Sequence, residues 1–415
     1  MQCDFTDTMC EPQFSEWGRL AEANRETLRE ITSSIGTVTL KSVRSAVIEE
    51  SLTFTSEMIK LAVSEGLEAE RLIPAQHLKR WQLAGENGIE ESTVYVSGHQ
   101  PVIYHSGIVY KTRLLAKAGA QPGSIAINVA VDSDEEDAGM FYYPVSSGSS
   151  AGVDSETVAA GGGVIASQKI RSKDEIAEAI KRIASSDAEG KHSARTAKLL
   201  AALELYKKFA GQNAAVANSI VRRIIDGHNS YLEVPITRLM HRPEVQSALL
   251  ALLGDPREWV RQFNDKLAGF RSANRIRNPA DPFPPLAVQP SEVELPFWVL
   301  NGGVREPLYY GGSLQEDIWG AADGKVVPRA ILITSFLRLF AGDLFIHGTG
   351  GQKYDAFTDY FLVNAMKIKP PVFAVATASR RLFEEERRRY EEEKASRQRF
   401  RNLLYHPEKF IAPGD

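Results

Sequence analysis

The 415-residue sequence predicts an α/β fold, with a Rossmann-like parallel sheet core, a helical insertion and a charged C-terminal helix. The prediction depends on two segments of one design: a short β-branched run, a turn rich in Gly and His, a helix-patterned stretch carrying a Lys, and another apolar run. The first reads TVYVSGHQPVIYHSGIVYKTRLLAKAG and then IAINVAVDSDEED, and the second reads DLFIHGTGGQKYDAFTDYFLVNAM and then PPVFAVATAS. Each has the plan of a strand–loop–helix–strand unit, whose helix N-terminus can present backbone N–H groups to an anion.

The chain divides into five consecutive segments. Residues 1–90 alternate polar turns with helix-like stretches, and strand character begins abruptly in residues 91–170, the first half of the core. In residues 171–276 apolar residues recur at threes and fours, which predicts the helical insertion. A proline-rich stretch opens residues 277–379, where strand signals return and form the second half of the core. Residues 380–415 hold one charged helix and a tail, with Glu and Arg paired four residues apart.

Composition excludes several classes of protein. The net charge is −4 with no long block of one sign, so nucleic acid is not expected as a partner. No apolar run approaches the ~20 residues that cross a bilayer, and the first residues lack the pattern of a secretory signal, so no membrane partner is expected. The only cysteines, Cys3 and Cys10, argue against a disulfide framework and fit a reducing compartment. We therefore expect a soluble, cytoplasmic protein.

The first candidate loop follows the first predicted core strand. Its glycine lets the backbone turn sharply, while two imidazoles, an amide and a lysine can bind phosphate oxygens and stabilise the charge that develops on them. The alternative is a tight structural turn with one buried histidine. The candidate residues are Gly98, His99, Gln100, His105, Gly107 and Lys111.

An acidic turn follows the next predicted strand. Ligands of open parallel sheets bind beyond the carboxyl ends of the strands, which is where Asp132 and Asp134 would lie. If the strand continues, both side chains point to the same side, and they could hold Mg²⁺, a ribose or a substrate amine. The alternative is a solvated acidic loop. No Cys/His spacing indicates zinc, so no residue is assigned as a metal ligand.

The second candidate loop lies between the strand LFIH and a helix. Its glycines permit close approach of the backbone to an anion, although it is neither a Walker A loop nor the GxGxxG loop that binds dinucleotides. Because right-handed crossovers place such loops at the same sheet edge, we expect the two candidate loops to face one cleft. The candidate residues are His347, Gly348, Gly350, Gly351, Lys353 and Asp355.

The motif SGHQPVIYHSGIVYK resembles the bacillithiol-biosynthesis cysteine-adding enzyme family, which has a TGQQ-type loop, a following Tyr and Lys, and an acidic turn after the next strand. The likeness is closer to bacterial relatives with TGHQPE-type and FIHGxGGxKYD-type motifs, and it covers both predicted strand–loop–helix–strand units. The resemblance implies a Rossmann-like core related to class I tRNA synthetases and nucleotidylyltransferases, and ligation of an amino acid to an amine through a nucleotide. This chain has SGHQ for TGQQ, and its acidic turn lacks the family's histidine, so cysteine and the amino sugar do not follow.

The sequence therefore predicts a bacterial ligase that binds ATP or another nucleotide, with Mg²⁺ left open, and joins an amino acid, cysteine among the candidates, to an amine of a small molecule. His99, Gln100 and Lys111 would stabilise the phosphates, and the second loop would hold the ribose or phosphate end. Two alternatives stay open. One is a phosphate-ester or sugar-nucleotide enzyme that uses His99 or His347 as acid or base. The other is a non-catalytic nucleotide-binding scaffold, and a homo-oligomer is left open throughout.

Overall fold

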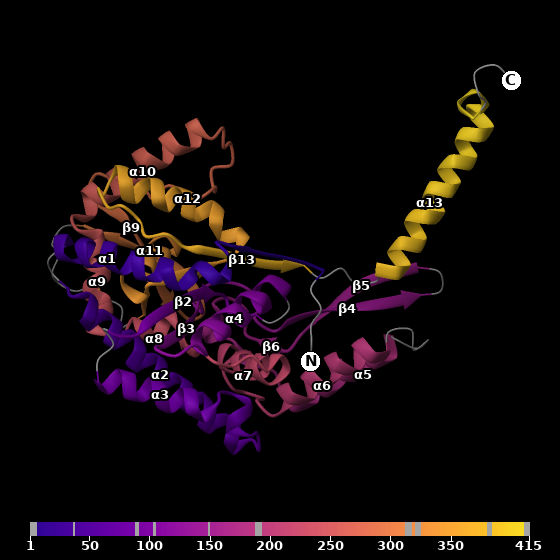
Figure 1. Ribbon diagram of the computed structural model, residues 1–415, viewed down its shortest axis with the longest axis horizontal. Coiled ribbons are helices and arrows are strands. Elements are labelled where there is room, and N and C mark those ends of the chain that lie inside the picture. The colour runs from indigo at the N-terminus through magenta and orange to yellow at the C-terminus, as the bar shows by residue number, and fades with distance from the viewer. Residues whose placement is uncertain are drawn as a thin grey trace.

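The computed structural model describes residues 6–35, 38–87, 91–102, 105–147, 150–186, 193–311, 318–319, 325–379 and 384–410. The predicted α/β fold is confirmed, because a six-stranded sheet forms its centre (Figure 1). Neighbouring strands are parallel except for the first, which pairs antiparallel at one edge. In spatial order the strands are β1 (Asp7–Glu11), β13 (Ala374–Ser379), β12 (Leu344–His347), β2 (Thr93–His99), β3 (Ser124–Ala130) and β8 (Leu232–Pro235).

The two predicted strand–loop–helix–strand units lie side by side in this sheet. In the first, α4 (Ser106–Gly119) connects β2 to β3, and in the second, α12 (Thr349–Asn364) connects β12 to β13. The units join where β2 pairs with β12, which brings Ser97 next to Ile346, 249 residues away in the sequence. The carboxyl ends of both strands therefore meet at one edge of the sheet, and the loop of each unit begins there.

Side chains of the central strands alternate between the two faces of the sheet, as the pleat requires. Val94 and Val96 of β2 face the larger apolar cluster, whereas Tyr95 faces a smaller cluster with Trp17 and Leu115. The smaller cluster lies under α1 (Trp17–Ile35) and α4. The larger one lies under α2 (Leu40–Ser64), α3 (Ala75–Asn87) and α9 (Pro243–Leu253). The N-terminal helices thus cover the sheet and complete the core.

The predicted helical insertion contains an element that the periodicity did not indicate. Its helices are α5 (Lys173–Ser186), α6 (Ser193–Lys207), α7 (Ala214–Asp226), α8 (Ile236–Leu239), α9 and α10 (Pro256–Ala273). Between α7 and α8 the chain forms β8, which extends the main sheet next to β3. The prediction of an almost wholly helical stretch did not include this strand, because four residues are too few to break a helical pattern visibly. The insertion is therefore part of the core.

Smaller elements surround the central sheet. The strands β4 (Met140–Ser147) and β5 (Ser150–Thr157) form a hairpin, and β6 (Ala159–Ala160) pairs with β7 (Lys169–Ile170). A three-stranded sheet consists of β9 (Val293–Asn301), β10 (Val304–Tyr310) and β11 (Val326–Pro328). The helix α11 (Ala330–Phe336) continues into a π-helical turn, Leu337–Ala341, directly before β12.

The predicted charged C-terminal helix is α13 (Glu384–Tyr405), which projects away from the rest of the molecule in Figure 1. Glu393 and Arg397 form one of the expected i,i+4 ion pairs. No helix in the described part of the chain combines the length and the apolar character that spanning a membrane requires.

Candidate functional site

A cavity of about 540 Å³ opens at the carboxyl ends of β2 and β12. Both candidate loops line it, so the prediction that they face one cleft is confirmed. Residues from α11 and the turn after it complete the wall. The lining side chains and glycines are Gly98, His99, Gln100, His105, Gly107, Ile108, Lys111, Val131, Asp134, Ala330, Ile333, Thr334, Leu337, Phe345, His347, Gly348, Thr349, Gly350, Gly351, Tyr354, Asp355, Ala376 and Thr377.

His99 stands at the end of β2. Its Nδ1 lies 3.1 Å from the carbonyl oxygen of Gln100, which can only accept, so the neutral ring carries its proton on Nδ1 and leaves Nε2 as an acceptor. Burial, reinforced by the nearby charge of Lys111, lowers the pKa of His99 to about 3. The ring is neutral across the physiological range.

His105 caps the N-terminus of α4. Its Nδ1 accepts a hydrogen bond from the backbone N–H of Gly107 at 3.1 Å, so Nε2 carries the proton of the neutral ring. A Cβ atom at position 107 would stand 2.8 Å from Oγ1 of Thr377 and 3.1 Å from the ring of His105. Gly107 is thus required where α4, β13 and the imidazole come together.

His347 repeats this arrangement at the end of β12. Its Nδ1 accepts a hydrogen bond from the backbone N–H of Gly348 at 2.9 Å, and its ring lies against Gly351, where any Cβ atom would overlap it. No side chain caps α12, whose N-cap is Gly348. Burial, with a smaller contribution from Lys111, lowers the pKa of His347 to about 3. Both helices thus begin at the cavity with an imidazole that contacts a glycine of the first turn.

Lys111 is 1% exposed and lines the cavity. Its Nζ donates a hydrogen bond to the carbonyl oxygen of Gly98 at 2.9 Å. Burial, together with the positive charge of Arg222, lowers the pKa of Lys111 to about 7. An anion beside Nζ would restore the charged form, because an opposite charge favours ionisation.

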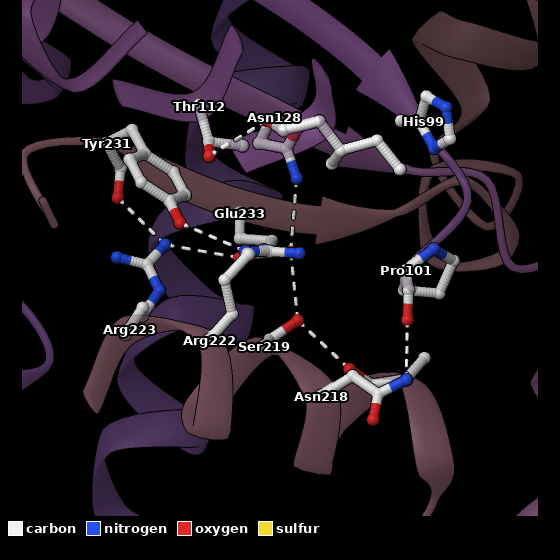
Figure 2. A network of polar contacts seen from close by, with 12 residues as sticks. His99, Pro101, Thr112, Asn128, Asn218, Ser219, Arg222, Arg223, Tyr231 and Glu233 are labelled. Atoms are coloured by element: carbon white, nitrogen blue, oxygen red, sulfur yellow. Dashed lines mark hydrogen bonds and ion pairs between the residues drawn. The ribbon is translucent and has the colours of Figure 1, made fainter. Parts of the chain in front are cut away.

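A buried network of charged side chains lies beneath the β2–α4 loop, between α7, β8 and β3 (Figure 2). The carboxylate of Glu233 accepts hydrogen bonds from Arg222 at 2.5 Å and Arg223 at 3.3 Å, as well as from Ser219 and Asn128. Although burial opposes it, these two arginines lower the pKa of Glu233. Because two guanidinium groups face one carboxylate, the network carries a net positive charge in the interior. The charge of Arg222 acts on Lys111 and lowers the pKa of its amine.

Asp134 lines the cavity, but its carboxylate is already engaged. Its Oδ2 accepts a hydrogen bond from Gln100 at 2.7 Å, and its Oδ1 accepts from Arg305 at 3.0 Å and from the backbone of Glu135. Asp134 therefore fixes the amide of Gln100 in the cavity wall. Arg305 lies on β10, so the three-stranded sheet also contacts the site.

Asp132 lies outside the cavity. The strand β3 ends at Ala130, so the continuation that would have aligned Asp132 with Asp134 does not occur. The Asp132 carboxylate is buried and accepts hydrogen bonds from the backbone N–H and the hydroxyl of Thr237, at 3.1 and 2.6 Å. Burial raises the pKa of Asp132 to about 6. The structure does not bring Asp132 together with the other candidates.

Asp355 of α12 is fully buried at the cavity wall. Its Oδ1 accepts a hydrogen bond from the Thr334 hydroxyl at 2.6 Å, and its Oδ2 lies 3.6 Å from Nε2 of His347. Arg338 stands 3.7 Å from Oδ1. Burial raises the pKa of Asp355 to about 6, against the opposing effect of Arg338.

The remaining candidate, Lys353, occupies the first turns of α12, but its side chain lies outside the described residues. Sequence reasoning missed Thr334 and Thr377, whose hydroxyl-bearing side chains line the cavity, and Asn218, Arg222 and Glu233 beneath it. In the sequence, the signal for this network was Glu233, an acidic residue that stands between apolar residues in LEVP. In the part of the chain that is described, no three His, Cys, Asp or Glu side chains gather closely enough to hold a metal ion.

Comparison with known proteins adds no assignment, since no protein-family model and no curated protein sequence matches the chain.

Proposed function

We propose that the chain is a nucleotide-dependent enzyme that joins an amino acid to an amine of a small molecule, and that it binds the nucleotide phosphates in the cavity between α4 and α12. The observation that carries the proposal is the convergence of both helix N-termini, with Lys111 between the two loops, on one cavity. Helix N-termini favour anions through their unpaired N–H groups and their dipoles.

The phosphate end of the cavity would consist of backbone N–H groups from the first turn of α12, the Lys111 amine and the imidazoles. The ring of His105 accepts a hydrogen bond at Nδ1, so its Nε2–H can donate one to a phosphate oxygen. Lys111 would supply the positive charge, and the buried arginine pair beyond it strengthens the field.

The ligation step is supported by the resemblance of SGHQPVIYHSG and its acidic turn to the cysteine-adding enzymes. In such a reaction the chain would act mainly by holding two reactants in contact and stabilising the charge of the leaving phosphate. Asp355, whose pKa lies near 6, is the carboxylate at the cavity best matched to accept a proton from an attacking amine. Asp132 lies outside the cavity, and both carboxylate oxygens of Asp134 accept side-chain hydrogen bonds, whereas Oδ2 of Asp355 accepts none from the described residues.

The rival reading, a phosphate-ester enzyme with His99 or His347 as acid or base, is disfavoured by their charge state. Efficient general acids and bases have pKa values near the working pH. A pKa of about 3 keeps either imidazole neutral and makes it a weak base.

The test combines binding with turnover. Calorimetry should detect binding of the β,γ-imido analogue of ATP. With ATP, each amino acid in turn, and labelled pyrophosphate or ADP, one amino acid should support isotope exchange into ATP. Nucleotide binding without exchange by any amino acid would favour the scaffold, and ATP hydrolysis without exchange would favour the phosphate-ester enzyme. Absence of nucleotide binding would overturn the proposal.

A further inference from the structure

The helix α7 of the insertion contacts the site through one buried side chain. Asn218 has no exposed surface, and its Nδ2 donates hydrogen bonds to two backbone carbonyl oxygens, of Pro101 at 2.6 Å and of Ala138 at 2.7 Å. Pro101 follows His99 and Gln100 in the loop after β2, and Ala138 ends the acidic loop after β3. One amide therefore connects the two loops that carry Gln100 and Asp134. Figure 2 shows its contact with Pro101.

A hydrogen bond from α6 fixes the orientation of the Asn218 amide. Tyr206 of α6, which is fully buried, donates its hydroxyl hydrogen to Oδ1 of Asn218 at 2.5 Å. With Oδ1 occupied by a donor, Nδ2 must point toward the two carbonyls. On the cavity side the same two loops are joined again by Gln100 and Asp134, at 2.7 Å. The loops are thus cross-linked on the buried side by Asn218 and on the ligand side by Gln100.

We propose that Asn218 is a positioning residue of the site: it holds the His99–Gln100 turn and the Asp134 loop in the arrangement that binds the ligand. Its loss would leave two buried carbonyl groups without a donor, and they would have to move to find one. The carbonyls belong to the segments that carry His99, Gln100 and Asp134, so the movement would open the cavity wall. The role of Asn218 in ligand binding rests on the proposed function, whereas its hold on the loops does not.

A matched control stands on the opposite edge of the sheet. Asn24 of α1 is also buried, and its Nδ2 also donates to two backbone carbonyl oxygens, of Asp343 at 2.9 Å and of Val372 at 2.7 Å. Both acceptors precede their strands, β12 and β13, and therefore lie away from the cavity. Replacing Asn24 removes the same kind of interaction without touching a site loop.

The experiment compares Asn218→Leu with Asn24→Leu in the full chain by hydrogen exchange. Exchange in segments 98–102 and 131–139 should be faster by about tenfold or more in Asn218→Leu and unchanged in Asn24→Leu, because local opening limits exchange in a folded protein. Tyr206→Phe, which removes only a hydroxyl, should accelerate the same two segments to a smaller extent. If Asn218→Leu does not fold, the exchange rates of Tyr206→Phe test the proposal instead. If the two segments exchange in Asn218→Leu at the wild-type rate, the proposal is overturned. If only Tyr206→Phe folds, a wild-type rate in that variant overturns it.

Calorimetry with the β,γ-imido analogue of ATP forms the second arm. Affinity should fall about tenfold or more in Asn218→Leu and stay at the wild-type value in Asn24→Leu, since small displacements of binding groups have large effects. Faster loop exchange with unchanged affinity would reject the role in ligand binding. If the wild type does not bind the analogue at all, the proposed function fails, and the exchange data still decide whether Asn218 holds the loops.

Discussion

The imidazole of His347 lies directly against the Cα atom of Gly351, so that a Cβ atom at position 351 would overlap the ring. The same ring accepts a hydrogen bond from the N–H of Gly348 and approaches Asp355 at 3.6 Å. One glycine in the first turn of α12 thus determines where the imidazole stands at the cavity.

Replacing Gly351 with Ala should displace His347 and leave the fold intact. The change puts a methyl group into the volume of the ring, while alanine is otherwise favourable in a helix. We expect affinity for the β,γ-imido analogue of ATP to fall by about tenfold, with a melting temperature near that of the wild type. Gly18→Ala is the control, because nothing lies within 4 Å of a Cβ atom there. Wild-type affinity in Gly351→Ala would show that His347 does not contribute to binding.

Gly350→Ala tests a different property, the close approach of a ligand to the helix backbone. A Cβ atom at position 350 meets nothing within 4 Å in the free protein, so the folded state accepts it. Stability should rise by roughly 0.4–1 kcal/mol, because alanine restricts the unfolded chain. Nucleotide affinity should nevertheless fall, since the methyl group occupies space at the cavity wall. Denaturant titration and calorimetry measure the two effects, and a gain in stability without loss of affinity would place the phosphates elsewhere.

Nucleotide binding should take up protons through Lys111. With a pKa of about 7, this amine is mostly neutral at pH 8, and a bound phosphate would favour its charged form. Calorimetry at pH 8 in buffers of different ionisation enthalpy should reveal uptake approaching one proton, and affinity should decline as the pH rises above 7. Lys111→Met should show neither effect.

His99→Asn is the matched control for this experiment. Because the pKa of His99 is about 3, its loss removes no group that titrates near neutral pH. The variant should keep the proton uptake and the pH dependence of the wild type, whatever its affinity. A pH profile that moves in His99→Asn would instead assign the titration to the imidazole.

Asp355→Asn should stabilise the protein in a pH-dependent manner. Burial raises the pKa of Asp355 from 3.8 to about 6, so between these values the folded state binds more protons than the unfolded state. Wild-type stability should therefore decrease as the pH rises from about 4 to about 6, and this decrease should be weaker in Asp355→Asn. Urea unfolding across this range measures the difference. The opposite slope would mean that Arg338 and Thr334 outweigh burial.

The sequence contained enough local information for the sheet and for most of the cavity. Neighbouring residues are enough to recognise short β-branched runs, the glycines that follow them, and helices with a regular apolar stripe. These patterns predicted β2, α4, β12 and α12. The rule that loops at strand carboxyl ends share one sheet edge then placed His99, His105, His347 and Gly350 in one cleft.

Tertiary contacts decided the rest. Whether Asp132 or Asp355 faces the cavity depends on where β3 ends and on partners such as Thr237 and Thr334, which are distant in the sequence. The charge states of His99 and Lys111 depend on burial, which no local pattern records. Asn218 lies in a helix that reads as an insertion, and only the folded chain brings its amide to Pro101 and Ala138. Local periodicity determines secondary structure, whereas burial and long-range pairing determine which polar side chains remain available to a ligand.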